Sequence, residues 1–458
     1  MFRAACFVTL AAIAVPEPAR AAPAYLVDSG VDAVDDDISD TACHTLAGTC
    51  TLRAAIMQAN HYSGSGNVAI SLPAGTYVLS IEASGSDDAD NGDLNLNAPP
   101  AGTSTISITG AGAATTVIDA DHIDRAFNIA TRVATISGVT VRNGSAGNGG
   151  GIFLGPLGNL TLTDAVVELN QAGQGGGIHN AGTMTLDNVV VKDNNGMFGA
   201  GIFSLLGLTI RNSTIKSNTS SYGGGIYNSG ILTIDRSTIS ANSSSFSGGG
   251  IYNTANAATS ASMTMTNSTV SNNHAQVNGG GMTSTQNGTL VVKVFNSSFI
   301  ANEAAANPVS GGRGGGVYST SGYQLSLSNS LIAGNYLSGG SSYEDCYNLG
   351  SLITGGGLNL FSATLDNCGP FANPSAVGST TTVAIGPLQA NGGPTFTHAL
   401  LEGSNAIGAV ASASCIGYDS LPVLVDQRGV SRVTDGFCDV GAFEYDFGRI
   451  FANGFDSP

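Results

Sequence analysis

A linked pair of motifs repeats along the middle of the chain, and this repeat limits the possible folds more than any other feature. An eleven-residue pattern, first seen from Leu160 to Asn170, returns at spacings of 24, 24, 24, 31, 29 and 33 residues between its closing asparagines. A glycine-rich motif such as Gly223-Gly-Gly-Ile226 lies between successive copies. Linked copies at a nearly fixed period predict a solenoid, in which each repeat packs only against its neighbours.

The pattern inside each repeat predicts short strands. In one copy, Leu208 and Ile210 are apolar before a polar corner at Asn212, and Ile215 is apolar after it. Alternation with period two on both sides of a corner indicates two strands that meet at a bend. A further strand begins at the glycine motif, which gives about three strands per coil. Such short strands must pair with equivalents one coil away, so we predict an all-β, single-stranded, right-handed parallel β-helix.

Stacked coils place equivalent side chains above one another. Asparagine tolerates a left-handed backbone at a bend, and its amide can bond to the same amide in the next coil. We therefore expect Asn188 to lie over Asn212. A second ladder is expected through the closing asparagines Asn170, Asn194, Asn218 and Asn242. The glycine triplets should form another corner, where a Cβ would clash or φ must be positive.

Open solenoid ends expose strand edges, so both ends should be covered. Thr51 precedes an apolar face that includes Leu52 and Ile56, which predicts a short helix to Asn60 as the N-terminal cap. After Asn335 the repeat fades into a disulfide-containing region that should cover the last coil. We divide the chain into a signal peptide (1–21), an N-terminal cap with irregular first coils (22–125), regular repeats (126–340), C-terminal coils and cap (341–446) and a short tail (447–458).

The first residues have the features of a signal peptide. Arg3 precedes an apolar stretch that is too short to cross a bilayer, and a small-x-small cleavage site follows at Ala19 to Ala21. We therefore expect export, and no other segment is apolar enough for a transmembrane helix. A net charge of −17 with only 15 basic residues argues against nucleic acid as a partner.

Six cysteines remain once Cys6 is removed with the signal peptide, and they form three local pairs. An even number of cysteines in an exported chain predicts disulfides. A metal site is the alternative, but no pair has C-x-x-C spacing and no histidine lies at ligand distance from two of the pairs. The predicted disulfides join Cys43 to Cys50, Cys346 to Cys368, and Cys415 to Cys438, all outside the repeats.

Both ends of the chain resemble exported bacterial β-helix proteins. The segment Cys50-Thr-Leu-Arg-Ala-Ala-Ile56 resembles their N-terminal signature Cys-Ser-Leu-Arg-Glu-Ala, with Ala54 in place of the usual Glu. Cys438-Asp-Val-Gly-Ala-Phe-Glu444, together with Asp426-Gln-Arg-Gly429, is similar to the C-terminal region of "choice-of-anchor" β-helix proteins.

The repeats and the tail add two further resemblances. Repeats such as the one with Gly314-Gly-Gly-Val-Tyr318 are similar to those of polymorphic outer-membrane proteins and adhesins. The tail from Ile450 to Asp456 resembles a short tail on exported proteins of some Gram-negative bacteria. Together these resemblances imply a surface-associated or extracellular β-helix of a Gram-negative-type bacterium, and they bring no catalytic residues with them.

Catalysis on an acidic polysaccharide is the main alternative, because the pectate-lyase-like solenoid also hosts lyases and hydrolases. A hydrolase needs converging carboxylates, and a lyase needs a base beside a neutralising cation or cluster. Two columns of charge contain the candidate catalytic residues, Asp187, Arg211 and Asp235 in one and Glu168, Lys192 and Lys216 in the other. The columns form either cross-coil ion pairs or a uronate site with Arg211 or a lysine as base. Solvent-facing positions beside a corner favour ion pairs.

An acidic loop from Ser86 to Asp93 is a candidate Ca²⁺ site through Asp88, Asp90 and Asp93. The loop lacks the EF-hand register and a bidentate Glu, which favours a solvated loop. We expect no other cofactor.

Aromatic residues follow the glycine motif at one repeat position and include Tyr227, Tyr252 and Tyr318. Such rings either pack at the corner or, if they face outward, stack on sugars. We therefore expect a structural or adhesion-type protein, monomeric and without evident catalytic machinery, whose partners are cell-surface or host glycans or proteins.

Overall fold

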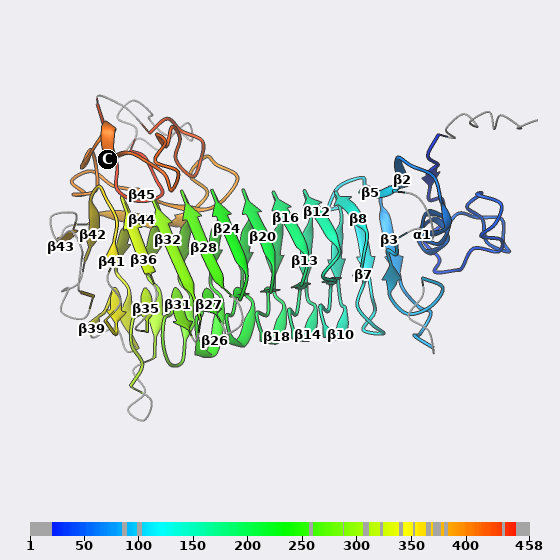
Figure 1. Cartoon of the computed structure of the whole chain (residues 1–458), viewed down its shortest axis with the longest axis horizontal. Coiled ribbons are helices and arrows are strands. Elements are labelled where there is room, and N and C mark those ends of the chain that lie inside the picture. Colours follow the sequence, from blue (N-terminus) through cyan, green and yellow to red (C-terminus); the bar gives the residue numbers. More distant parts are fainter. Residues whose placement is uncertain are drawn as a thin grey trace, which may run out of the picture.

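The computed structural model describes residues 21–84, 89–98, 103–255, 260–286, 288–305, 311–320, 324–338, 342–350, 353–362, 368–369, 377–379, 383–432 and 436–445. These residues form an elongated solenoid with a helix at its N-terminal end and an irregular C-terminal region beside its other end (Figure 1). The predicted signal peptide, apart from Ala21, and the predicted tail lie outside the described residues.

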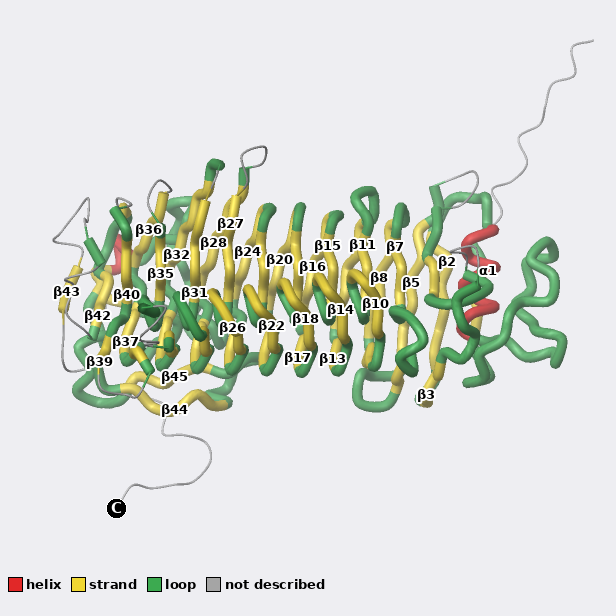
Figure 2. Tube along the Cα trace, turned by 90° about the horizontal axis from the view of Figure 1, so that it is seen from below, coloured by secondary structure: helices red, strands yellow, loops and turns green. Residues whose placement is uncertain are grey.

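Four sheets run along the solenoid, and their strands pair in parallel with the strands of adjacent coils (Figure 2). Sheet 1 comprises β1 (Ala24–Leu26), β2 (Asn67–Leu72), β5 (Thr105–Gly110), β8 (Val133–Ser137), β12 (Asn159–Thr163), β16 (Thr183–Asp187), β20 (Gly207–Arg211), β24 (Ile231–Asp235), β28 (Ala261–Thr266), β32 (Leu290–Phe295), β36 (Gln324–Ser328) and β41 (Ile353–Thr354). Sheet 2 comprises β3 (Gly75–Val78), β6 (Thr116–Asp119), β9 (Thr140–Arg142), β13 (Val166–Glu168), β17 (Val190–Lys192), β21 (Thr214–Lys216), β25 (Thr238–Ser240), β29 (Thr269–Ser271), β33 (Ser298–Ile300), β37 (Leu331–Ala333), β42 (Asn359–Phe361) and β43 (Val377–Ser379).

The other two sheets complete each coil. Sheet 3 comprises β10 (Ser145–Asn148), β14 (Gln171–Gln174), β18 (Asn195–Phe198), β22 (Thr219–Tyr222), β26 (Ser243–Ser247), β30 (His274–Ala275), β34 (Glu303–Ala304), β38 (Tyr336–Leu337) and β39 (Ser342–Tyr343), of which only β39 pairs antiparallel. Sheet 4 comprises β4 (Leu94–Asn95), β7 (Phe127–Ile129), β11 (Ile152–Leu154), β15 (Ile178–Asn180), β19 (Ile202–Ser204), β23 (Ile226–Asn228), β27 (Ile251–Ala255), β31 (Met282–Gln286), β35 (Val317–Ser319) and β40 (Cys346–Asn348).

Regular coils therefore contain four strands, where the sequence predicted about three. The additional strand belongs to sheet 3 and begins directly after each closing asparagine of the repeat. Its inward positions hold small residues, such as the buried Ala172, Ser220 and Ser244. Large apolar residues do not alternate along it, so the pattern that identifies the other strands is missing.

The core and the predicted register agree with the sequence. Leu186 pairs with Ile210, and Ile210 pairs with Ile234 in the next coil, so equivalent apolar residues stack along the axis. All three side chains are buried. Because every coil adds the same inward residues, one continuous apolar column fills the solenoid.

The asparagine ladder forms as predicted. The Nδ2 group of Asn194 donates to Oδ1 of Asn218 at 3.0 Å, and the same oxygen accepts a bond from the backbone N–H of Asn194 at 3.0 Å. Asn170 donates to Asn194 in the same way, and Asn218 donates to Asn242. These amides are buried, so their bonds satisfy polar groups that water cannot reach.

Asn188 and Asn212 lie at equivalent positions of adjacent coils, as predicted, and both have the expected left-handed backbone, with φ of 55° and 48°. The predicted bond between their amides does not form. Nδ2 of Asn188 donates to Asp164 Oδ1 at 2.6 Å, and Nδ2 of Asn212 donates to Asp187 Oδ1 at 2.8 Å. A carboxylate within reach is a stronger acceptor than an amide, which explains the exchange of partner.

The glycine corner needs glycine for both predicted reasons. Gly223 has a φ of +66°, a conformation that other residues rarely adopt. A Cβ on Gly224 would lie 2.4 Å from the carbonyl oxygen of Gly249 in the next coil. The coils can therefore approach each other here only without side chains.

The N-terminal cap and the disulfides also agree with the predictions. Helix α1 (Leu52–His61) begins after Thr51, whose side chain accepts a bond from the Ala54 N–H at 3.1 Å. Arg53, in the first turn of this helix, is buried and forms an ion pair with Asp32 at 2.6 Å. The disulfides join the three predicted pairs, Cys43 to Cys50, Cys346 to Cys368 and Cys415 to Cys438.

The C-terminal region lies against the flank of the solenoid, whereas we expected it over the last coil (Figure 1). Corner asparagines of three later coils hold it: Nδ2 of Asn267, Asn296 and Asn329 donates to backbone oxygens of the region at 3.0, 3.2 and 2.8 Å. The region contains two antiparallel strand pairs. In the first, β44 (Ile385–Gln389) pairs with β45 (Thr397–Leu400), and in the second, β46 (Val410–Ala411) pairs with β47 (Phe437–Cys438). A 3₁₀ turn (Ser412–Ser414) follows β46.

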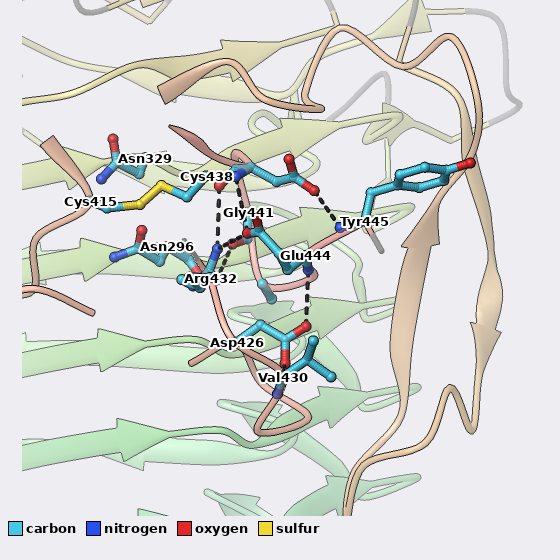
Figure 3. A network of polar contacts seen from close by, with 12 residues as sticks. Asn296, Asn329, Cys415, Asp426, Val430, Arg432, Cys438, Gly441, Glu444 and Tyr445 are labelled. Atoms are coloured by element: carbon cyan, nitrogen blue, oxygen red, sulfur yellow. Dashed lines mark hydrogen bonds and ion pairs between the residues drawn. A yellow bond between two sulfur atoms is a disulfide. The ribbon is translucent and has the colours of Figure 1, made fainter. Parts of the chain in front are cut away.

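A buried polar network fixes this region to the coils (Figure 3). Nη2 of Arg432 donates to Asn267 Oδ1 at 2.9 Å and to the carbonyl of Asn296 at 3.3 Å, and its Nη1 lies 3.4 Å from Glu444 Oε2. Burial, reinforced by the nearby carboxylate of Asp439, raises the pKa of Glu444 to about 8. The outward residues of sheet 2 are consequently buried from β25 onward, as Thr238 is, and half-buried on the three strands before it, as Val190 and Thr214 are.

Candidate functional site

The two charge columns form as predicted: Asp187, Arg211 and Asp235 end strands of sheet 1, and Glu168, Lys192 and Lys216 end strands of sheet 2. Nζ of Lys192 lies 2.6 Å from Glu168 Oε2, and this pair raises the pKa of the lysine. The predicted cross-coil ion pair is therefore confirmed for these two residues. Arg211 lies in register between two aspartates, but it forms no ion pair among the described residues.

The aspartates beside Arg211 have other partners. Asp187 accepts a bond from Asn212, and Asp235 lies 3.1 Å from the guanidinium of Arg236. From β12 to β25, the two columns and the corner residues that directly follow them hold five carboxylates and four cations: Asp164, Glu168, Asp187, Asp193 and Asp235 against Lys192, Arg211, Lys216 and Arg236. A uronate would meet no net positive field here, which weakens the candidate catalytic site.

The predicted aromatic stripe is a ladder of stacked rings. Phe153, His179, Phe203, Tyr227 and Tyr252 stack in turn with centroids 5.0 to 5.2 Å apart. Their faces are therefore largely occupied by neighbouring rings, which leaves edges rather than faces for a ligand.

The third predicted tyrosine, Tyr318, lies outside this ladder. It stacks on Tyr347 in a separate pair, with ring centroids 5.9 Å apart. Burial and the neighbouring tyrosines raise the pKa of Tyr227 to about 12. Burial lowers the pKa of His179 to about 4, so this histidine is a neutral rung of the ladder.

The candidate Ca²⁺ site is only partly within the described residues, because Asp88 lies outside them. Asp93 is buried and faces the cap: its Oδ1 accepts a bond from Asn95 at 2.6 Å, and its Oδ2 lies 3.2 Å from Nε of Arg125. Asp90 accepts a bond from Asn91 at 2.7 Å. In the described part of the chain, no three His, Cys, Asp or Glu side chains gather as metal ligands would. Calcium binding here stays a prediction.

A groove of about 390 Å³ lies on the outer face of sheet 3 and crosses the coils of four adjacent strands, β10, β14, β18 and β22. Figure 2 shows these strands side by side along the solenoid. The groove is lined by Ser145, Ala146, Gln171, Ala172, Gly173, Asn195, Gly196, Met197 and Ser221. None of these lining residues carries a charge.

The ladder asparagines position the groove. The strands β14, β18 and β22 of sheet 3 each begin one residue after a ladder asparagine, so Gln171 and Asn195 pair in register beside buried amides. Both are exposed, and the glycines and alanines beside them keep the floor low. The groove therefore presents amide donors and acceptors at successive coils.

A second aromatic ladder runs beside the groove. Phe198 stacks on Tyr222 with centroids 5.8 Å apart, and Tyr222 stacks on Phe246 at 5.1 Å. Phe198 pairs in register with Gln174 on its other side, where the preceding coil has no ring. Amides in a groove beside aromatic rings are the combination with which proteins bind sugars.

This site was not predicted from the sequence, because the strands of sheet 3 were not predicted. The available signal was weak: polar residues follow the closing asparagine at the same repeat position, as Gln171 and Asn195 do. The tyrosines after the glycine motif were the more conspicuous pattern, and they lie at the adjoining corner.

A second cavity, of about 410 Å³, lies in the N-terminal cap between residues 38–41 and the end of α1. Its one buried polar side chain, Gln58, donates to Asp35 Oδ1 at 2.8 Å and to the carbonyl of Asp37 at 3.0 Å. These bonds hold the cap together, so the groove on sheet 3 is the better candidate site.

One family model agrees with the architecture. Residues 125–332 match a family model described as the right-handed β-helix region, which supports the predicted handedness. A crystal structure of pectate lyase Pel9A aligns with a TM-score of 0.49 and 18% sequence identity, over 93% of this chain and 98% of that chain. Comparison with curated protein sequences gives no match. Among the described residues, no helix has the length and apolarity that a bilayer crossing requires.

Proposed function

We propose that the chain is an exported, cell-surface or secreted β-helical protein of structural or adhesive role, monomeric, that binds glycans through the groove on sheet 3. The uncharged groove beside an aromatic ladder carries this proposal. Gln171 and Asn195 would bond to sugar hydroxyls, since an amide both donates and accepts. The rigid ladder beneath them fixes their spacing before any ligand binds, which lowers the entropic cost of binding.

The alternative, a lyase or hydrolase of acidic polysaccharide, has less support. Lys192 is engaged with Glu168, and the carboxylates beside Arg211 outweigh its charge. A lyase must neutralise the uronate carboxylate so that a base can remove the adjacent proton. A surface that carries more carboxylates than cations does not favour this neutralisation of the uronate.

A direct test compares binding with catalysis. The mature protein is passed through gels that contain neutral or uronate polysaccharides, and retardation reports binding. Parallel incubations with uronate polymers are followed by the absorbance of unsaturated products and by a reducing-end assay.

We expect retardation by a neutral glycan, lost in the Gln171→Ala/Asn195→Ala variant. Asn159→Ala is the matched control, because Asn159 is an exposed amide on sheet 1, outside the groove. Product formation that disappears in Arg211→Ala or Lys216→Ala would instead establish the enzyme. Binding that survives the double substitution would remove the groove from the proposal.

A further inference from the structure

We infer that the ligand of the groove is a neutral, unbranched polysaccharide that lies parallel to the solenoid axis. This inference rests on the proposed function and specifies its ligand. Three features of the groove carry it: its direction, its lack of charge and the ring ladder along its side.

The direction follows from the strand register. Ser145, Gln171 and Asn195 are partners on successive strands, so the groove crosses coils instead of following one coil. Four rungs at about 4.8 Å give the groove a length of roughly 14 Å along the axis. Each sugar residue of an extended polysaccharide lengthens the chain by about the spacing between two rungs. The site therefore fits a chain of about four sugars, with one residue per rung.

The choice of a neutral chain follows from the charges. No lining residue is charged, and the chain carries a net charge of −17. An acidic polymer would be repelled at long range and would find no cation in the groove. Amides suit hydroxyl groups, which donate and accept in the same way.

The ring ladder favours an unbranched chain. Phe198, Tyr222 and Phe246 stack along the axis, so they follow the groove for its later coils. Met197 protrudes from the lining and is 57% exposed. A branch that points toward Met197 and the ring ladder would collide with their side chains, whereas the edge of a linear sugar chain can pack against them.

Calorimetric titration with oligosaccharides of two to six residues tests the inference. The probes are unbranched β-1,4-linked glucose and mannose oligomers, with uronate oligomers of equal length as the charged comparison. We expect affinity to rise on the order of three- to ten-fold per added residue, up to about four residues, and then to level off. Gln171→Ala/Asn195→Ala should abolish this length dependence, and Asn159→Ala should preserve it.

Removal of one whole coil provides a second measurement. Deletion of residues 183–206 takes out 24 residues and joins coils that are already in register. Circular dichroism verifies that the shortened solenoid folds. We expect affinity to level off one sugar residue earlier, because the groove loses one rung.

The outcomes separate the inference from the proposed function. Binding of neutral oligomers without length dependence, or tighter binding of uronates, overturns the inference while glycan binding itself stands. No binding of any glycan by the full chain in the gels or by titration overturns both.

Discussion

Substitution of Asn218 by alanine should show how much the asparagine ladder stabilises the solenoid. Its Oδ1 accepts bonds from the backbone N–H and the Nδ2 group of Asn194, both at 3.0 Å. Its Nδ2 group donates to Asn242 Oδ1 at 3.0 Å and to the carbonyls of Val191 and Lys216 at 3.1 and 3.0 Å. Alanine leaves all five partner groups without these bonds.

The expected cost follows from the loss of these bonds, four of which are fully buried. Each buried group that loses its bond costs about 1 kcal/mol or more, so the substitution should lower the free energy of unfolding by roughly 4 to 6 kcal/mol. Asn212→Gly is the matched control, from the same coil. Glycine accepts the left-handed backbone of Asn212, and only one partly buried bond, to Asp187, is lost. Its cost should stay below about 1 kcal/mol.

Urea unfolding, followed by circular dichroism because the chain contains no tryptophan, measures both variants. Hydrogen exchange should place the loss of protection in the coils on each side of Asn218, since a solenoid unit contacts only its neighbours. The same loosening should weaken glycan binding, because Asn195 follows the ladder residue Asn194. Equal destabilisation by the two substitutions would refute the argument that the buried ladder, rather than any corner amide, stabilises the fold.

Two further predictions concern pH. The pKa of His179 is about 4, below its ordinary 6.5, so the folded chain should lose roughly 3 kcal/mol of stability as pH falls from 6.5 through 4. His179→Phe should remove this loss in melting temperatures measured against pH, and an unchanged profile would contradict it. The pKa of Glu444 is raised from 4.5 to about 8, so the C-terminal region should weaken as pH rises between these values. Glu444→Gln should abolish that trend in hydrogen exchange of residues 436–445, whereas a trend that persists would assign it to another group.

The sequence predicted the parts of the fold that repeat. A buried amide at one position of every coil must bond to something, and the only group that recurs beside it is the same amide, so the ladder through Asn194 and Asn218 followed from spacing alone. Asn188 shows the limit of this argument. An aspartate one coil away competes for its amide, and the choice between two acceptors depends on distances that spacing does not specify.

The place of the C-terminal region could not be predicted for a different reason. Gln427 bonds to Thr269 at 2.6 Å across 158 residues, and the region around it does not repeat. Periodicity relates a residue to its neighbour one coil away and carries no information on which flank a non-repeating segment contacts. The groove residues Gln171 and Asn195 were not predicted because their strands are short and polar. Large apolar residues do not alternate with polar ones along these strands, so the sequence does not show which positions are buried.

The ladder also has a direction, and this bears on where the solenoid ends. Every ladder asparagine from Asn170 onward donates one bond to the side-chain oxygen of the asparagine in the next coil toward the C-terminal end. The last asparagine of the ladder therefore needs an acceptor that is not another asparagine of the repeat. Asp345 supplies it: its Oδ1 accepts from Nδ2 of Asn335 at 2.9 Å, and its Oδ2 accepts from the N–H of Ser362 at 2.8 Å. A carboxylate only accepts, so it ends a column of donors without requiring a further coil. Sheet 3 turns back at the same point, where β39 pairs antiparallel with β38, and Cys346 forms its disulfide at the next residue. Hydrogen-bond polarity and covalent closure thus coincide at the end of the solenoid, so the column that begins beneath the groove ends on a bonded acceptor.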